Sequence, residues 1–341
     1  MAHLAPELIL EILEWLYYTP KGIVDYASLS SCCLLSKAWC SVAQHLLFRR
    51  VKIKDLPPSR LAVDIRVLDI EIPPELSSRS NLPLFARIIT SCSSLYDLGL
   101  TTPKDLTCFD RRTLSLLSSA RPPIKALRIC GASRSAILFQ ILAVFPDIRH
   151  LVLLSGVFIR PPRESCTHSF YEVSIRKKNN NQVLEWLFAA SNSLRILEVW
   201  YKHNDMYTVL DTSNIQQLVS FHALYYEHEE SQFVRICPNL QEIVVETSLT
   251  LRFGPFPGTV ESLGYGRLLS SDSVLEIFMK TADGLPKLRA VFCQIFPSWQ
   301  LRAPKLKQFC QERGIELRLT DNPLIESNVV RYSVFNIFLQ T

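Results

Sequence analysis

Glycine is scarce in this chain, with 10 among 341 residues, so few backbone segments are suited to cradling a phosphate group. No phosphate-binding loop and no Gly-x-Ser-x-Gly turn occurs, and Gly264-Tyr265-Gly266 lacks the third glycine of a dinucleotide fingerprint. The ten cysteines include no Cys-x-x-Cys pair, so the ligand spacing typical of zinc sites is also missing. The sequence therefore predicts no catalytic residues, no metal site and no cofactor.

Signals for secretion and for membrane insertion are missing as well. No charged segment followed by an apolar core and a cleavage site is visible near the first residue, and no Asn-x-Ser/Thr acceptor occurs. The longest nearly uninterrupted apolar run, residues 136–145, is about half of the ~20 residues that a membrane span needs. We therefore expect a cytoplasmic or nuclear protein with no membrane partner, whose cysteines stay reduced and act as small buried hydrophobes.

The composition favours a large apolar core over a charged binding surface. Hydrophobic residues make up 48% of the chain and charged residues only 20%. The net charge of +5 arises from 37 basic and 32 acidic residues, which gives no strong case for a nucleic-acid partner. The length suits two or three domains, or one small domain followed by a repeat array.

The first fifty residues predict three short helices that carry more apolar surface than so small a unit can bury. Pro6 suits a first helical turn, Asp25 is placed to cap the second helix, and a third helix is expected over residues 39–48. The first helix has an apolar stripe at helical spacing, formed by Leu8, Ile9, Ile12, Leu13 and Leu16. Units of about 40–50 residues bury too little surface to be stable alone. The surplus apolar surface is expected to meet the remaining chain or another protein.

This stretch resembles an F-box of the fungal variety, in which an LPxE opening, an apolar helix and a serine-lysine-x-tryptophan segment follow one another. The residues that carry the resemblance are Leu4, Pro6, Glu7, Leu8, Ile12, Leu13, Leu34, Leu35, Ser36, Lys37, Trp39 and Phe48. Ala5 departs from the pattern, because that variety has a proline there. The alternative interpretation is an ordinary helical cap on a larger domain.

The resemblance implies a docking partner, the Skp-type adaptor of a cullin–RING ubiquitin ligase. The residues that it assigns to this contact are Leu4, Pro6, Leu8, Ile12, Leu34, Leu35 and Lys37. Trp39 is instead expected to hold the three helices together.

A repeat organises the rest of the chain. Its phrase is an apolar residue, two variable residues, an apolar residue, one variable residue and a last apolar residue, as in Ile124/Leu127/Ile129 and Leu194/Leu197/Val199. It recurs at intervals of about 20–30 residues, a period that indicates stacked strand-plus-helix units. Helical patterns lie between the phrases, most clearly over residues 135–145, 182–190, 231–237, 274–279 and 306–313.

These repeats resemble the leucine-rich regions that follow many F-boxes, without the asparagine or cysteine that the regular family pattern places after each phrase. The predicted fold is therefore mixed α/β, a three-helix F-box followed by an irregular leucine-rich-repeat-like strand-helix solenoid. The predicted domains are residues 3–54 for the F-box, 55–322 for the substrate-recognition solenoid and 323–341 for a C-terminal tail or cap. A compact α/β domain with a shared apolar rhythm is the alternative.

If each phrase is a strand, the residues between its apolar positions point to the other side of the sheet, which we expect to be solvent-facing. Solenoids bind partners on such an inner face. The substrate-binding candidates there are Arg128, His150, Glu198, Trp200, Glu242, Glu246 and Phe292. Trp200 and Phe292 are the aromatic anchors among them, and the alternative is that all seven are merely solvated strand positions. His222 and His228, with the glutamates near them, are interpreted as a polar loop.

The function that the F-box resemblance implies is a substrate-recognition adaptor of a Skp–cullin–F-box ubiquitin ligase, which is expected to bind an unknown protein substrate on its repeats. The protein is not expected to be an enzyme. One alternative is an adaptor-bound scaffold that does not direct ubiquitination. Another is an enzyme whose α/β domain hides a convergent active site.

Overall fold

The structure is a computed structural model, and it describes residues 6–16, 25–47, 50–53, 65–72, 74, 82–189, 192–201, 209–210, 215–226, 228–247, 256–265, 272–294 and 303–320. The chain divides into two compact units between Ile148 and Arg149. This division falls inside the predicted repeat region. The predicted tail, residues 323–341, lies outside the described residues, and so does Leu4.

The first unit begins with the three predicted helices, α1 (Pro6–Leu16), α2 (Tyr26–Cys32) and α3 (Lys37–Leu47). Their shared core consists of Ile9, Leu13, Leu29, Cys32, Ala43 and Leu46. Trp39 is partly buried and packs against this core, as expected of a residue that holds the helices together. The helices therefore form a small packed unit with an apolar interior of its own.

Short polar caps set where the second and third helices begin. The Asp25 carboxylate accepts hydrogen bonds from the Ser28 backbone N–H at 3.0 Å and from the Ser28 hydroxyl at 2.8 Å, which confirms the predicted cap. The Ser36 hydroxyl accepts from the Trp39 N–H at 3.4 Å at the start of α3. Between the two helices, residues 33–35 form a turn whose N–H groups donate to α2 carbonyls.

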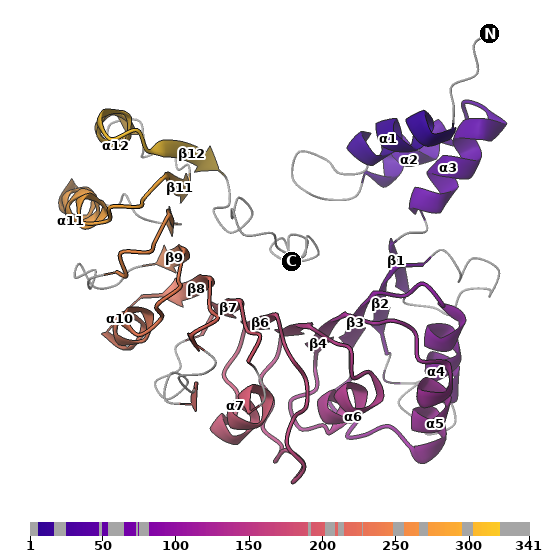
Figure 1. The fold of residues 1–341 in the computed structure, drawn as a ribbon. Coiled ribbons are helices and arrows are strands. Elements are labelled where there is room, and N and C mark those ends of the chain that lie inside the picture. The colour runs from indigo at the N-terminus through magenta and orange to yellow at the C-terminus, as the bar shows by residue number, and fades with distance from the viewer. Residues whose placement is uncertain are drawn as a thin grey trace. The chain divides into compact units, whose positions relative to one another are not determined.

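A parallel sheet completes the first unit (Figure 1). Its elements are β1 (Arg50–Ile53), β2 (Val67–Glu71), α4 (Leu82–Ser91), β3 (Asp97–Thr101), α5 (Arg111–Ala120), β4 (Ala126–Cys130) and α6 (Ile137–Val144). The strands pair in chain order, and Leu68, Leu98 and Leu127 lie in register. The helices lie on one side of the strands.

The second unit repeats the arrangement, again with each strand paired to the next in chain order. Its strands are β5 (His150–Leu153), β6 (Glu172–Ile175), β7 (Ile196–Val199), β8 (Ser220–Tyr225), β9 (Glu242–Thr247), β10 (Ser262–Tyr265), β11 (Ala290–Gln294) and β12 (Glu316–Thr320). Its described helices are α7 (Asn181–Phe188), α10 (His228–Arg235), α11 (Asp272–Asp283) and α12 (Ala303–Glu312). They lie on one side of their strands (Figure 1).

The prediction that each repeat phrase forms a strand is confirmed. The second and third apolar positions of the phrase pair in register with those of the neighbouring strands, as Leu151, Val173 and Leu197 do, and they are buried.

Gly314 ends α12 with a positive φ of 65°, and the following Ile315 N–H donates to the Cys310 carbonyl at 2.8 Å. Helices α4 and α5 are not among the clearest helical patterns of the sequence. None of the described helices is long and apolar enough to cross a membrane.

Candidate functional site

The three-helix unit carries an exposed apolar surface beside its closed core. Leu34 and Leu35, in the turn between α2 and α3, are 87% and 67% exposed. Leu8, Ile12 and Leu16 are exposed on α1, so the predicted apolar stripe divides into a buried side and an exposed side. Folding of the three helices therefore leaves several large apolar side chains in contact with water.

Four of the seven residues predicted for adaptor contact belong to this exposed set, namely Leu8, Ile12, Leu34 and Leu35. Pro6 and Lys37 are the first residues of α1 and α3, and their side chains lie outside the described part of the structure, as does the whole of Leu4. We call the exposed side chains of Leu8, Ile12, Leu16, Leu34 and Leu35 the apolar patch.

The sheet face opposite the helices, here called the second face, is more buried than the sequence predicts. Four of the predicted substrate-binding residues on it are buried instead of solvent-facing: Arg128, Glu198, Glu242 and Phe292. Arg128 is 3% exposed and Phe292 is not exposed at all. His150 and Trp200 are half-buried, and the Glu246 side chain lies outside the described residues. The predicted exposure of these four residues is wrong, because side chains of neighbouring strands lie against one another and form polar and aromatic contacts.

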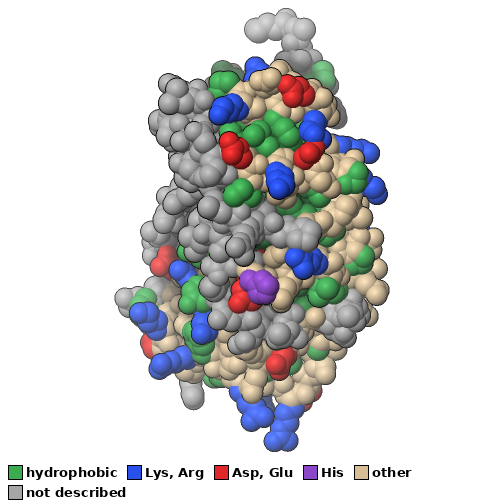
Figure 2. Space-filling model, turned by 90° about the vertical axis from the view of Figure 1, so that its left-hand side faces the viewer, with side chains coloured by type: hydrophobic (Ala, Val, Ile, Leu, Met, Phe, Trp, Pro, Cys, Tyr) green, Lys and Arg blue, Asp and Glu red, His purple; other side chains and the backbone are tan. Residues whose placement is uncertain are grey.

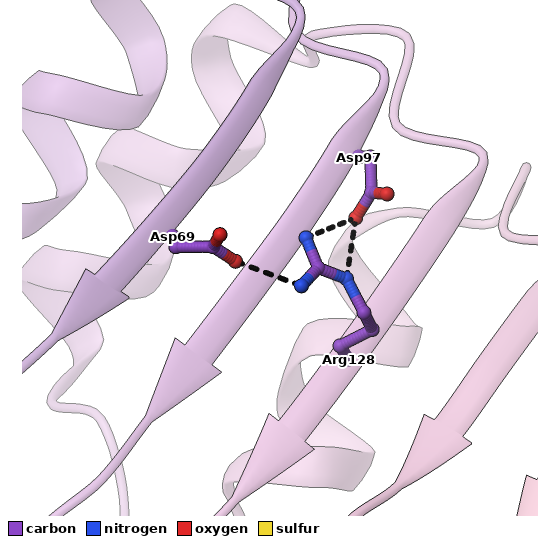
Figure 3. A network of polar contacts seen from close by, with 3 residues as sticks. All are labelled: Asp69, Asp97 and Arg128. Carbon is purple, nitrogen blue, oxygen red and sulfur yellow. Dashed lines mark hydrogen bonds and ion pairs between the residues drawn. The ribbon is translucent and has the colours of Figure 1, made fainter. Parts of the chain in front are cut away.

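In the first unit, Arg128 on β4 stands between two aspartates (Figure 3). Its guanidinium donates from Nε to Asp97 Oδ1 at 3.1 Å, and its terminal nitrogens lie 2.9 Å from Asp69 Oδ1 and 3.1 Å from Asp97 Oδ1. Gly99 lies on β3, between the strands of Asp69 and Arg128, and pairs in register with both residues. A Cβ at position 99 would lie 3.3 Å from Arg128 Cζ and inside contact distance of Asp69. The missing side chain of Gly99 is what lets the ion pair form across β3.

In the second unit, two polar contacts between side chains of neighbouring strands continue this pattern. His150 Nδ1 lies 3.2 Å from the buried Glu172 Oε2. Arg176 Nη2 lies 3.3 Å from Glu198, and the Arg176 guanidinium stacks 4.0 Å from the centre of the Trp200 ring. Trp200 is therefore occupied by an intramolecular cation–π contact in this structure.

A serine, a histidine and a glutamate meet at β8 and β9, but not in the order that a hydrolase uses. The Ser220 hydroxyl donates to Glu242 Oε1 at 2.7 Å, and His222 Nε2 lies 2.9 Å from the same oxygen. A catalytic serine instead gives its proton to the histidine. All three residues are buried, so they join two strands and are not exposed to a substrate. His222 is thus a strand residue, and its interpretation as part of a polar loop is wrong.

The described residues show no group of three or more histidine, cysteine or acidic side chains that would hold a metal ion. Most of the cysteines are buried, and burial raises the pKa of Cys92 to about 11 and that of Cys237 to about 12. A thiol with so high a pKa is almost entirely protonated at neutral pH and is a poor nucleophile.

Sequence reasoning did not identify Asp69, Asp97 or Gly99. A signal was available, because Asp69, Gly99 and Arg128 occupy the same position within three successive repeat phrases.

On the side of the molecule where α10, α11 and α12 lie, Figure 2 shows acidic and basic side chains interspersed with apolar ones. This mixture favours neither a polyanion nor a polycation as a partner for the described part of that face.

The sequence matches no protein-family model, and no curated protein matches it. Among solved structures, the chain is similar to human 5T4 (Wnt-activated inhibitory factor 1, trophoblast glycoprotein). The identity is 15% and the TM-score is 0.28, with 72% of this chain and 76% of that chain covered. A likeness at this TM-score says nothing about the function of either chain's surfaces.

Proposed function

We propose that this protein is an F-box substrate-recognition adaptor of a Skp–cullin–F-box ubiquitin ligase. The apolar patch would dock on the Skp-type adaptor, and the repeats would hold a protein substrate. The observation that carries the proposal is the exposure of Leu34 and Leu35 at a turn of the three-helix unit, whose core is complete without them.

The apolar patch is not needed to complete the core of the three helices. The buried set contains Ile9 and Leu13 from α1, Leu29 from α2 and Leu46 from α3, so each helix already contributes its own inner face. The backbone N–H groups of Leu34 and Leu35 donate to the Ser31 and Cys32 carbonyls at 3.0 and 3.2 Å. The turn is thus held by its backbone while both side chains point away from the core. Exposed apolar side chains that lie near one another, as the adjacent Leu34 and Leu35 do and as Leu8, Ile12 and Leu16 do at intervals of four along α1, mark protein contact sites.

The F-box resemblance supports one particular partner for this patch. The pattern assigns Leu8, Ile12, Leu34 and Leu35 to the adaptor contact, and the same four side chains are exposed. The residue that the pattern places in the helical interior, Trp39, packs on the core. A pattern that separates contact residues from packing residues in this way supports docking of a Skp-type adaptor, through which a cullin–RING ligase would be recruited.

Co-purification of the full chain with a Skp-type adaptor tests the proposal. A Leu34→Ala/Leu35→Ala variant should reduce recovery of the adaptor at least about tenfold, because the two leucines would bury most of their apolar area in the complex. Both side chains are already exposed, so the thermal unfolding temperature of the variant should equal that of the wild type. Ile236→Ala is the matched control, since Ile236 is a 55% exposed apolar residue of the second unit.

Equal adaptor recovery by the wild type and the double variant, with Ile236→Ala also unchanged, would rule out this docking surface. Reconstituted ubiquitination of a bound partner then separates a ligase subunit from a scaffold. Adaptor binding without any ubiquitin transfer to the partner would favour the scaffold.

A further inference from the structure

A row of residues at the amino ends of β5, β6 and β7 combines two arginines with a tyrosine. Arg149, Tyr171 and Arg195 each directly precede one of these three strands. The Arg149 carbonyl accepts from the Tyr171 N–H at 2.8 Å, and the Tyr171 carbonyl accepts from the Arg195 N–H at 2.9 Å. These backbone bonds place the three residues side by side, at the same level of neighbouring strands. We call them the arginine row.

Both arginines of the row are exposed, and within the described structure neither has an ion-pair partner. The acidic residue nearest in sequence to Arg149 is Asp147, whose carboxylate is 3.1 Å from Lys125. Glu172, next to Tyr171, is buried against His150. Glu198, the acidic residue nearest in sequence to Arg195, lies 3.3 Å from Arg176, so neither positive charge is neutralised by the acidic group closest to it along the chain.

Further along the second unit, the arginine at the corresponding position has a paired charge. Arg289 occupies the equivalent position before β11, with its N–H bonded to the Glu261 carbonyl at 2.8 Å. Its guanidinium lies 3.9 Å from the Glu261 carboxylate, so its charge has a partner within the protein. The unpaired arginines are thus a feature of β5 and β7, and Arg289 offers a matched position with a compensated charge.

We infer that the arginine row binds an acidic segment of a partner protein that crosses the amino ends of β5–β7. The backbones of Arg149 and Arg195 are two strand spacings apart, which is about 10 Å. A polyproline II segment advances about 3.1 Å per residue with three residues per turn, so acidic side chains three residues apart lie on the same side of it, about 9 Å from each other. Guanidinium groups bind carboxylates and phosphates by paired hydrogen bonds, and both kinds of anion suit the row.

Tyr171 supplies a surface between the two charges. It is half-buried, and its ring lies 5.7 Å from the His150 ring at an interplanar angle of 55°. The packing against His150 fixes the ring beside the two flexible arginines. A partner segment can therefore place an uncharged residue on Tyr171 while its acidic residues meet the arginines. As a substrate-binding site, the row rests on the proposed ligase function, whereas the binding of an acidic segment does not depend on it.

A peptide array and fluorescence anisotropy test the inference with the full chain. The probes are twelve-residue peptides with two glutamates, or two phosphoserines, separated by one to six positions in a neutral background. The wild type should prefer a separation of three, and affinity should fall as salt is raised from 50 to 500 mM. Arg149→Ala/Arg195→Ala should weaken binding about tenfold or more, and Arg289→Ala should leave it unchanged. Comparison of the glutamate and phosphoserine arms identifies the preferred anion.

Three results would overturn the inference: no binding of any acidic peptide, equal binding by the double variant, or an equal loss in Arg289→Ala. A single-stranded RNA that binds more tightly than every peptide, with the same dependence on Arg149 and Arg195, would also overturn it in favour of a nucleic-acid surface. The Leu34→Ala/Leu35→Ala variant should bind the peptides normally, and the arginine variant should recover the Skp-type adaptor normally. Failure of the row and failure of the docking proposal are thus distinguishable.

Discussion

Replacement of Gly99 by alanine should disrupt the buried ion pair between Asp69 and Arg128. The new Cβ would lie inside contact distance of the Asp69 carboxylate oxygen, 3.2 Å from Asp69 Cγ and 3.3 Å from Arg128 Cζ. Asp69 sits on a strand of the sheet, and Arg128 is also held by Asp97, so neither can move away without loss of a polar contact. The methyl group therefore separates two charges that water does not reach easily.

The cost follows from the burial of these groups. Breaking a buried ion pair costs about 3–5 kcal/mol, because the Asp69 carboxylate keeps its desolvation penalty after Arg128 is lost as its partner. A stability loss of 1 kcal/mol lowers the unfolding temperature of a domain of roughly this size by about 2–4 °C. Gly99→Ala should therefore lower the unfolding temperature of the first unit by about 6–20 °C.

Differential scanning calorimetry and urea unfolding of the full chain measure this effect. Gly258→Ala is the control, since a Cβ there meets nothing within 4 Å and stability should change by less than about 0.5 kcal/mol. In an Asp69→Ala background the penalty of Gly99→Ala should shrink, because the clash with the carboxylate is gone. A Gly99→Ala protein within about 1 kcal/mol of the wild type would refute the role given to this glycine.

Two further predictions concern the cap and the cysteines. Hydrogen bonds from the Ser28 N–H and hydroxyl lower the pKa of Asp25 below its ordinary 3.8, so the cap stabilises α2 above that pH and is lost as pH falls through the lower folded value. The difference in unfolding temperature between wild type and Asp25→Ala should thus be full at pH 6 and vanish towards pH 2; a difference that grows on acidification would contradict this. An alkylating reagent at pH 8 should modify the exposed Cys108 first and leave Cys92 and Cys237 unmodified until unfolding, as followed by peptide mass spectrometry. Early labelling of Cys237 would contradict its burial.

The sequence determined the elements that depend on local apolar spacing. The repeat phrase predicted strands that the structure pairs in register, because an apolar residue at every second position requires one buried sheet face. Asp25 marked a helix start, since capping depends on a few neighbouring residues. The F-box resemblance assigned Leu34 and Leu35 to a contact and Trp39 to packing, and in the structure the two leucines are exposed and Trp39 packs on the core.

Tertiary structure alone decided which polar residues are available to a partner. Alternation placed Arg128 and Glu242 on the correct face, but it carried no information about what lies beside them on neighbouring strands. Their burial arises from Asp69 and Asp97 in one unit and from Ser220 and His222 in the other, residues that lie 20 or more positions away. The arginine row also depends on tertiary structure, because Arg149 and Arg195 lie on the two sides of Tyr171 only when β5, β6 and β7 align. Contacts between strands are set by register across the sheet, and a single sequence shows the pattern within each strand but not its neighbour's charge.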